Sequence, residues 1–97
     1  MPFVCRHRES GVIVAAWQRN VYDLPYYGVL WWETGEDAER ESEARLSECG
    51  YDDISSWETV EVTESRVKLM NVKLNNNDAR TVVLERDGSI QVSFERP

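Results

Sequence analysis

Short runs rich in β-forming residues recur along this chain, and in some of them hydrophobic and polar residues alternate with the two-residue period of β-strands. The alternation puts apolar residues on one face of a strand and polar residues on the other. Together these runs predict strands that are separated by turn-forming residues, at 3–8, 12–17, 57–64, 82–84 and 90–94. Four consecutive apolar residues at 29–32, followed by Glu33, predict a further strand over 29–33 that we expect to be buried on both faces.

The first two runs are expected to form a hairpin. Their connection, Glu9-Ser10-Gly11, suits a three-residue loop in which Gly11 is left-handed and Arg8 lies opposite Val12. The same register pairs Phe3 with Trp17, Cys5 with Ala15 and His7 with Ile13. That face is mostly apolar, so we expect it to be a core face.

The last two runs form a second predicted hairpin. A two-residue loop at 87–88 would pair Leu84 with Gln91 and split the apolar residues between opposite faces. A three-residue loop at 86–88 pairs Leu84 with Ile90 and keeps the apolar residues together. We therefore expect the second register, with a positive φ at Gly88.

Residues 66–74 are also rich in β-forming side chains, but their alternation slips. Val67 and Leu69 share one parity, whereas Met70, Val72 and Leu74 share the other. A β-bulge near Leu69 would reconcile the two sets, and so would burial on both faces. We interpret the segment as an irregular strand.

One helix is expected at residues 36–49. Thr34 opens a pattern that resembles a capping box, acidic side chains follow in the first turn, and Gly50 suits a left-handed C-cap. Its buried stripe would be thin and made of small residues, namely Ala38, Ser42, Leu46 and Cys49. Such a stripe predicts a helix that lies close against a sheet.

These elements predict a single small α+β domain over residues 1–97. Its order is β-β-β-α-β-β-β-β, and its sheet is mostly antiparallel, with six or seven strands and a single α-helix packed on it.

Residues 18–28 interrupt the strands and are rich in aromatic side chains. Pro25 disfavours a helix at Leu24 and removes a backbone donor, so we interpret the segment as a surface loop. Its three tyrosines offer the large, rigid surfaces that are typical of binding hot spots. A small β-rich domain also fills its core with aromatic rings, and the sequence leaves that alternative open.

The charge is concentrated in the middle third of the chain. The net charge is −7, to which residues 1–32 contribute +1, residues 33–64 contribute −10 and residues 65–97 contribute +2. Nucleic-acid binding relies on basic side chains that neutralise phosphates, and anionic membranes repel an acidic protein. We therefore expect no direct nucleic-acid partner and no membrane partner. The acidity favours a basic protein partner, for a protein that is a monomer or a weak homodimer.

Two cysteines are too few for the disulfide framework of a small secreted protein. The sequence begins with no signal-peptide pattern, and its apolar runs are too short to cross a bilayer. These features predict a cytoplasmic protein with reduced thiols.

No motif predicts catalysis. Cys5 and His7 share a strand face and Cys49 would add a third soft ligand, but zinc sites use three or four ligands at tight spacing. The lone His leaves little general-base capacity near neutral pH, and the five glycines are scattered instead of forming a phosphate loop. We expect neither an enzyme nor a bound cofactor or metal.

The leading hypothesis is a small non-enzymatic interaction module that binds a protein partner. Its contacts are expected at Tyr22, Tyr26 and Tyr27 of the aromatic segment and at Glu36, Glu39 and Glu43 of the acidic helix. Two alternatives remain open. The first is a small-molecule or metal-binding protein that uses Cys5, His7 and nearby aromatic rings. The second is an acidic mimic of nucleic acid that inhibits an enzyme.

Overall fold

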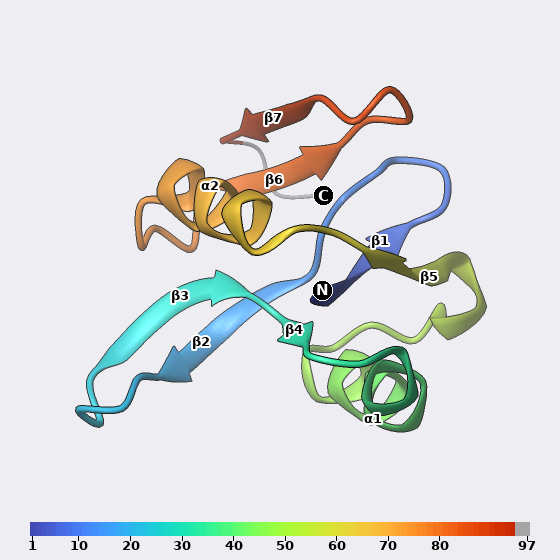
Figure 1. The fold of residues 1–97 in the computed structure, drawn as a ribbon, viewed down its shortest axis with the longest axis horizontal. Coiled ribbons are helices and arrows are strands. Elements are labelled where there is room, and N and C mark those ends of the chain that lie inside the picture. The colour runs from blue at the N-terminus through green and yellow to red at the C-terminus, as the bar shows by residue number, and fades with distance from the viewer. Residues whose placement is uncertain (95–97) are drawn as a thin grey trace.

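The computed structural model describes residues 1–94 as an α+β fold whose paired strands are antiparallel (Figure 1). Its elements are β1 Phe3–His7, β2 Ala15–Arg19, β3 Pro25–Val29, β4 Trp31–Trp32, α1 Gly35–Glu48, the 3-10 turn η1 Ile54–Ser56, β5 Trp57–Glu61, α2 Glu64–Leu74, β6 Thr81–Leu84 and β7 Ile90–Ser93. The α+β class agrees with the prediction. The predicted order does not, because the described chain has two helices and divides its strands among three small sheets.

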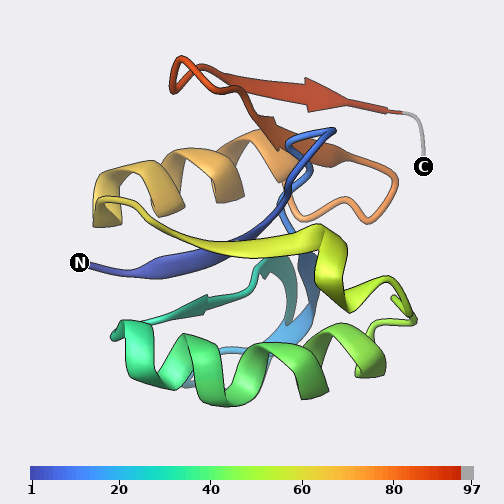
Figure 2. The ribbon, with the colours of Figure 1, turned by 90° about the vertical axis from the view of Figure 1, so that its right-hand side faces the viewer.

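Strand β1 lies at the centre of the fold. It pairs with β4 along one edge and with β5 along the other. Helix α1 covers one side of this sheet, and α2 lies on the other side, where it packs against β3, β6 and β7 (Figure 2). Successive residues of β1 belong to two different hydrophobic clusters. Val4 lies in the cluster of α2, which includes Val67, Met70 and Leu74. Cys5 lies in the cluster of α1, which includes Ala38 and Leu46. The central strand is therefore buried on both faces.

Helix α1 begins and ends close to where the sequence predicts. Thr34 Oγ1 accepts a hydrogen bond from the backbone N–H of Asp37 at 3.1 Å, which caps the first turn. Gly50 follows the last turn with a φ of +89°. The predicted stripe is confirmed, since Ala38 and Leu46 are buried while Ser42 and Cys49 are half-buried.

Residues 64–74 form helix α2, so the predicted irregular strand is wrong. Thr63 caps the helix by accepting a hydrogen bond from Arg66 N at 3.2 Å. The buried residues of α2 are Val67, Met70 and Leu74, which lie three and four positions apart. Residues three and four positions apart lie on the same face of a helix. The step of three from Val67 to Met70 changes odd to even numbering, which is why the apolar residues fit no single strand face.

The first predicted hairpin is only partly correct. The chain turns back at Gly11, whose φ is +81°, but His7 faces Val12 where Arg8 was expected, so the register is one residue off. The returning chain makes one isolated bridge to β1, between Arg6 and Ile13, and one to β6, between Val12 and Val83. It then leaves β1 because β4 occupies the same edge of β1 at Phe3 and Val4.

Strand β2 pairs with β3 instead of β1, and the register joins Ala15 to Val29 and Arg19 to Pro25. The interpretation of residues 18–28 as one loop is therefore wrong, because only residues 20–24 lie outside the strands. Pro25 is the first residue of β3, a position at which a strand tolerates the missing N–H.

The predicted strand at 29–33 is divided at Leu30 between β3 and β4. Within β4, Trp32 is buried and Trp31 is exposed, so this part of the run is not buried on both faces.

The C-terminal hairpin has the predicted register. Leu84 pairs with Ile90 and Val82 with Val92, and Gly88 has a φ of +91°. The apolar residues Val82 and Leu84 are buried in the cluster of α2.

Candidate functional site

The hairpin made of β2, residues 20–24 and β3 extends away from the body of the molecule, and we call it the hairpin arm (Figure 1). Its base lies between the two hydrophobic clusters, with Ala15 packed against the cluster of α2 and Ala16 against that of α1. The tip, residues 20–24, lies at the far end of the arm.

The tip is a tight, well hydrogen-bonded turn. Asn20 Oδ1 accepts hydrogen bonds from the backbone N–H groups of Tyr22, at 2.9 Å, and Leu24, at 3.1 Å. Asn20 N donates to the carbonyl oxygen of Leu24 at 3.0 Å, and Arg19 Nη1 donates to the carbonyl oxygen of Asp23 at 2.8 Å. Asp23 adopts a φ of 60°, a left-handed value that Asp tolerates better than most residues. The local sequence therefore fixes the shape of the tip.

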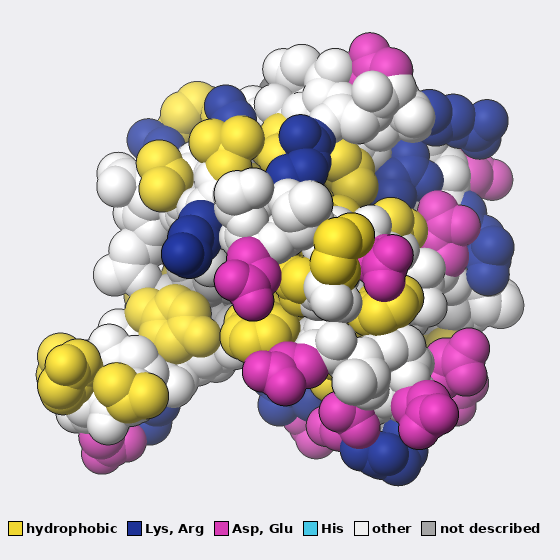
Figure 3. Space-filling model, viewed as in Figure 1, with side chains coloured by type: hydrophobic (Ala, Val, Ile, Leu, Met, Phe, Trp, Pro, Cys, Tyr) yellow, Lys and Arg dark blue, Asp and Glu magenta, His cyan; other side chains and the backbone are white. Residues whose placement is uncertain are grey.

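Three large apolar side chains of this tip face solvent. Val21 is 93% exposed, Tyr22 is 79% exposed and Leu24 is 59% exposed. In the space-filling view the arm stands out at the lower left, and its end is largely apolar (Figure 3). Single exposed apolar residues are common, but a cluster on a projecting element is typical of an interaction surface.

The three predicted tyrosines occupy different environments. Tyr22 is at the tip, whereas Tyr26 and Tyr27 are half-buried along β3. The hydroxyl of Tyr26 lies 3.3 Å from Gln18 Oε1, and the ring of Tyr27 packs against the ring of Trp17, with centroids 5.5 Å apart. The exposed tip residues Val21 and Leu24 were not among the predicted contact residues. Their position between Asn20 and Pro25, both turn-forming residues, was the available signal.

The outer edge of β3 is covered by side chains of α2 and the loop that follows it. Asn71 Oδ1 accepts a hydrogen bond from Val29 N at 2.9 Å, and Asn76 Oδ1 accepts one from Tyr27 N at 2.6 Å. Gly28 fits here because a Cβ at this position would lie 2.9 Å from Asn71 Oδ1. These amide groups replace a neighbouring strand and fix the arm to the body.

The predicted acidic contacts lie on a separate surface. Glu36, Glu39 and Glu43 are all exposed on α1, which packs against β1, β4 and β5 and lies well apart from the tip (Figure 1). Their neighbour Arg40 is paired with Asp37 and Glu41. The aromatic and acidic groups therefore belong to two surfaces of the molecule.

The chemistry proposed for Cys5 and His7 has little support in their surroundings. Cys5 is buried, and burial raises the pKa of its thiol to about 11. His7 Nδ1 accepts hydrogen bonds from the backbone N–H groups of Glu9 and Ser10, at 3.3 and 3.2 Å. These bonds stabilise the turn that follows β1. Among residues 1–94, no three His, Cys, Asp or Glu side chains are grouped so that they could hold a metal ion.

The other ring nitrogen of His7 faces Asp53. Nε2 lies 3.5 Å from Asp53 Oδ2, and the His7 ring packs edge-on against Trp57. The hydrogen bond from Trp57 Nε1 lowers the pKa of the Asp53 carboxyl, and the neighbouring His7 acts in the same direction. This cluster joins β1 to η1 and β5, which is a structural role.

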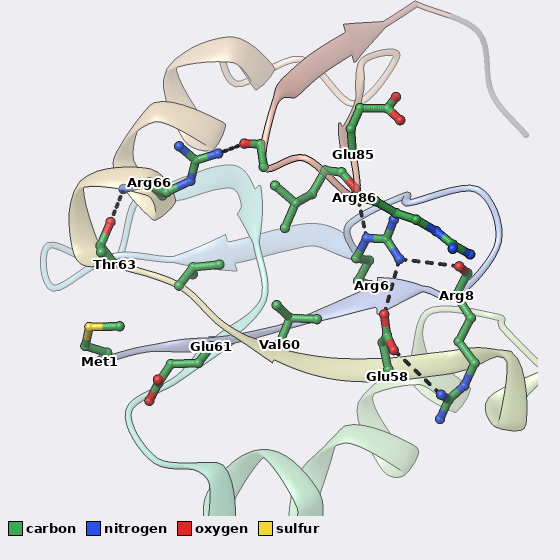
Figure 4. A pocket seen from close by; sticks show the side chains of 13 residues that line it. Met1, Arg6, Arg8, Glu58, Val60, Glu61, Thr63, Arg66, Glu85 and Arg86 are labelled. Atoms are coloured by element: carbon green, nitrogen blue, oxygen red, sulfur yellow. Dashed lines mark hydrogen bonds and ion pairs between the residues drawn. The ribbon is translucent and has the colours of Figure 1, made fainter.

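A hollow of about 700 Å³ lies where β1, β5, α2 and the β6–β7 loop meet (Figure 4). Arg6 is buried in its wall, where Nε donates to the carbonyl oxygen of Leu84 at 2.8 Å and Nη1 to Glu58 Oε2 at 3.2 Å. Arg66 donates to the carbonyl oxygen of Gly88. Because Glu58, Glu61 and Glu85 also line the hollow, its basic groups do not form a strong anion site. These contacts tie the C-terminal hairpin to the central sheet.

Comparison with protein-family models, with curated proteins and with solved structures gave no match. Neither helix in the described part of the chain has the length and apolar character needed to cross a membrane.

Proposed function

We propose that this protein is a non-enzymatic interaction module that binds a protein partner through the hairpin arm. The observation that carries the proposal is the exposure of Val21, Tyr22 and Leu24 on an ordered, projecting turn. These side chains contribute little to the core, so their apolar surface is free to be buried by another molecule. Tyr22 adds a rigid ring with a polar hydroxyl, a combination that is enriched at binding hot spots.

The order of the tip supports the proposal because it reduces the cost of binding. Fixing a flexible loop costs conformational entropy, which lowers the affinity of any contact that the loop makes. In the hairpin arm, Asn20 and Arg19 already hold the turn in one conformation. A partner would therefore meet a preformed surface.

The charge of the molecule bears on the kind of partner. The net charge is −7, and the exposed Glu36, Glu39 and Glu43 lie on a different surface from the tip. An acidic molecule attracts a basic partner over a distance of about one Debye length, roughly 8–10 Å at physiological salt. Binding of a basic partner at the arm would accordingly weaken as salt is added.

The test compares the wild-type protein with a variant that carries Val21→Ser, Tyr22→Ser and Leu24→Ser. The purified proteins are immobilised, and proteins retained from an extract of the native cell are compared. We expect the variant to fold normally and to lose the partner that the wild type retains. A matched variant with Glu36→Ser, Glu39→Ser and Glu43→Ser should keep that partner, with slower association at most. Equal retention by the wild type and the tip variant would overturn the proposal.

A further inference from the structure

Both ring nitrogens of His7 have polar neighbours. Nδ1 lies 3.3 Å from the backbone nitrogen of Glu9 and 3.2 Å from that of Ser10, and Nε2 lies 3.5 Å from Asp53 Oδ2. Backbone N–H groups only donate, so Nδ1 must accept and carries no proton in this arrangement. The one proton of the neutral ring therefore belongs on Nε2, where it faces the Asp53 carboxylate. The observed turn thus requires the neutral form of His7.

A second proton on the His7 ring would be placed on Nδ1. That nitrogen would then be a donor that faces two donors, so the N–H groups of Glu9 and Ser10 would both lose their acceptor. Asp53 acts in the opposite sense, because a carboxylate 3.5 Å from Nε2 favours the positively charged ring. Protonation is therefore favoured on one side of the ring and conflicts with the turn on the other. The ring can accept the proton only if the turn changes.

The turn that His7 holds, residues 8–11, contacts the C-terminal hairpin (Figure 2). Leu84 N donates a hydrogen bond to the carbonyl oxygen of Gly11 at 2.9 Å. The approach is close, since a Cβ at Gly11 would lie 2.7 Å from the carbonyl oxygen of Leu84. A change in the turn would therefore alter its contact with β6.

We propose that His7 is a pH-sensitive switch for this contact. In its neutral form it holds residues 8–11 against β6, and in its protonated form it releases the turn and weakens the hydrogen bond between Leu84 and Gly11. Histidine is the side chain that ordinarily changes charge between about pH 5 and pH 8, so the turn should loosen as pH falls through this range. The hairpin arm takes no part in this change.

The elements around His7 carry other titratable or charged groups. They are Glu9 of the turn, Asp53 before η1, Cys49 and Tyr51 after α1, and the ion pairs Arg8–Glu58, at 3.6 Å, and Arg45–Glu48, at 3.1 Å. The hydrogen bond from Trp57 Nε1 lowers the pKa of the Asp53 carboxyl, so Asp53 stays ionised between pH 5 and pH 8. Burial raises the pKa of Cys49 and of Tyr51, so both stay neutral there. The ring of His7 thus gains its charge opposite a carboxylate that is already ionised.

Nuclear magnetic resonance of the full chain, between about pH 8 and pH 5, follows the ring and the turn together. The ring signals of His7 and the amide signals of Glu9 and Ser10 should change with one midpoint. The protection of the Leu84 amide against hydrogen exchange should fall about tenfold from pH 8 to pH 5, after correction for the ordinary pH dependence of exchange. Titration of the ring with unchanged protection at Leu84 would overturn the inference, and so would a ring that stays neutral to pH 5.

His7→Asn is the matched control. The side-chain oxygen of Asn accepts hydrogen bonds from backbone N–H groups just ahead of it in the chain, as Asn20 does at the tip of the hairpin arm. It can replace Nδ1 but does not titrate, and every other titratable group is retained. The variant should therefore keep the protection of Leu84 at both pH values. An equal loss of protection in His7→Asn and in the wild type would assign the change to another group and contradict the switch.

Asp53→Asn tests the other side of the ring, and it remains decisive if His7→Asn does not fold. The side-chain oxygen of Asn can still accept the hydrogen bond from Trp57 Nε1, but the charge that favours the protonated ring is removed. The loss of protection at Leu84 should therefore move to lower pH. A loss at the same pH as in the wild type would show that the titrating group does not face Asp53, which excludes His7.

Discussion

Asn20 decides the conformation of the hairpin tip more than any other single residue. Its side-chain oxygen accepts two backbone hydrogen bonds, and its own N–H forms the last pair of the β2–β3 ladder. A four-atom side chain thereby satisfies donors that would otherwise need water. The exposed Val21 and Tyr22 keep fixed directions because of these bonds, so the proposed binding surface depends on one polar side chain that need not contact the partner.

Asn20→Ala should loosen the tip while leaving the fold intact. The lost hydrogen bonds involve an exposed turn, so we expect the free energy of unfolding to fall by about 1 kcal/mol or less. Hydrogen exchange measures the effect locally: the amides of Tyr22 and Leu24 should exchange faster, and those of Val4 and Met70 should not change. Unchanged protection at Tyr22 and Leu24 would show that Asn20 does not hold the turn.

The buried thiol of Cys5 should make the protein less stable at alkaline pH. Burial raises the pKa of its thiol from 9.0 to about 11, so the folded state binds this proton more tightly than the unfolded state. Between these two pKa values the unfolded state loses the proton first, and stability therefore falls as pH rises from about 9 through about 11. Below pH 9 this contribution is fully present.

Cys5→Ala tests this linkage through chemical unfolding at a series of pH values. The variant should lose less stability than the wild type between pH 9 and pH 11. Tyr51, whose pKa is also raised by burial, titrates in both proteins, so the difference between them isolates Cys5. Parallel stability curves for the two proteins would contradict the raised pKa.

At the scale of elements, the sequence predicted what short-range patterns control. Thr34 and Gly50 placed both ends of α1 because capping is local, and the parity of Val82, Leu84 and Ile90 gave the register of the last hairpin. The pairing of β1 could not be predicted in this way. Its neighbours β4 and β5 are distant in the sequence, and β4 displaces the hairpin that Gly11 begins.

Helix α2 was misread because its sequence contains β-branched residues and its apolar residues do not form a clear stripe. Leu69 and Val72 are apolar yet exposed, and counting them as core residues conceals the helical spacing of Val67, Met70 and Leu74. For the candidate site, the sequence identified the aromatic segment but could not show which rings face solvent. That outcome depends on how α2 packs against β3.

A pair of substitutions distinguishes the helix from the strand that the pattern suggested. Met70 is fully buried and Val72 is 71% exposed, although a strand would place them on the same face. Met70→Ala should lower the free energy of unfolding by about 2–5 kcal/mol. Val72→Ala should change it by about 0.5 kcal/mol or less. Similar losses for the two variants in chemical denaturation would contradict the helix.

At the scale of the whole molecule, the fold separates the hydrophobic core from the proposed contact surface. The two hydrophobic clusters lie on either side of β1, and α1 and α2 cover them. The exposed acids Glu36, Glu39 and Glu43 on α1 and the apolar tip of the arm lie on distinct surfaces. The tip can therefore change without damage to the core, which is the arrangement expected of a module whose partner contacts evolve apart from its fold.

The proposed contact surface for a protein partner is the tip of the hairpin arm. Site-specific photo-crosslinking tests it most directly, with a photoreactive amino acid placed at Tyr22 in one protein and at Glu43 in another. Illumination in the native cell should give a discrete adduct from position 22 and no matching adduct from position 43. An adduct from position 43 alone, or none from position 22, would contradict the claim.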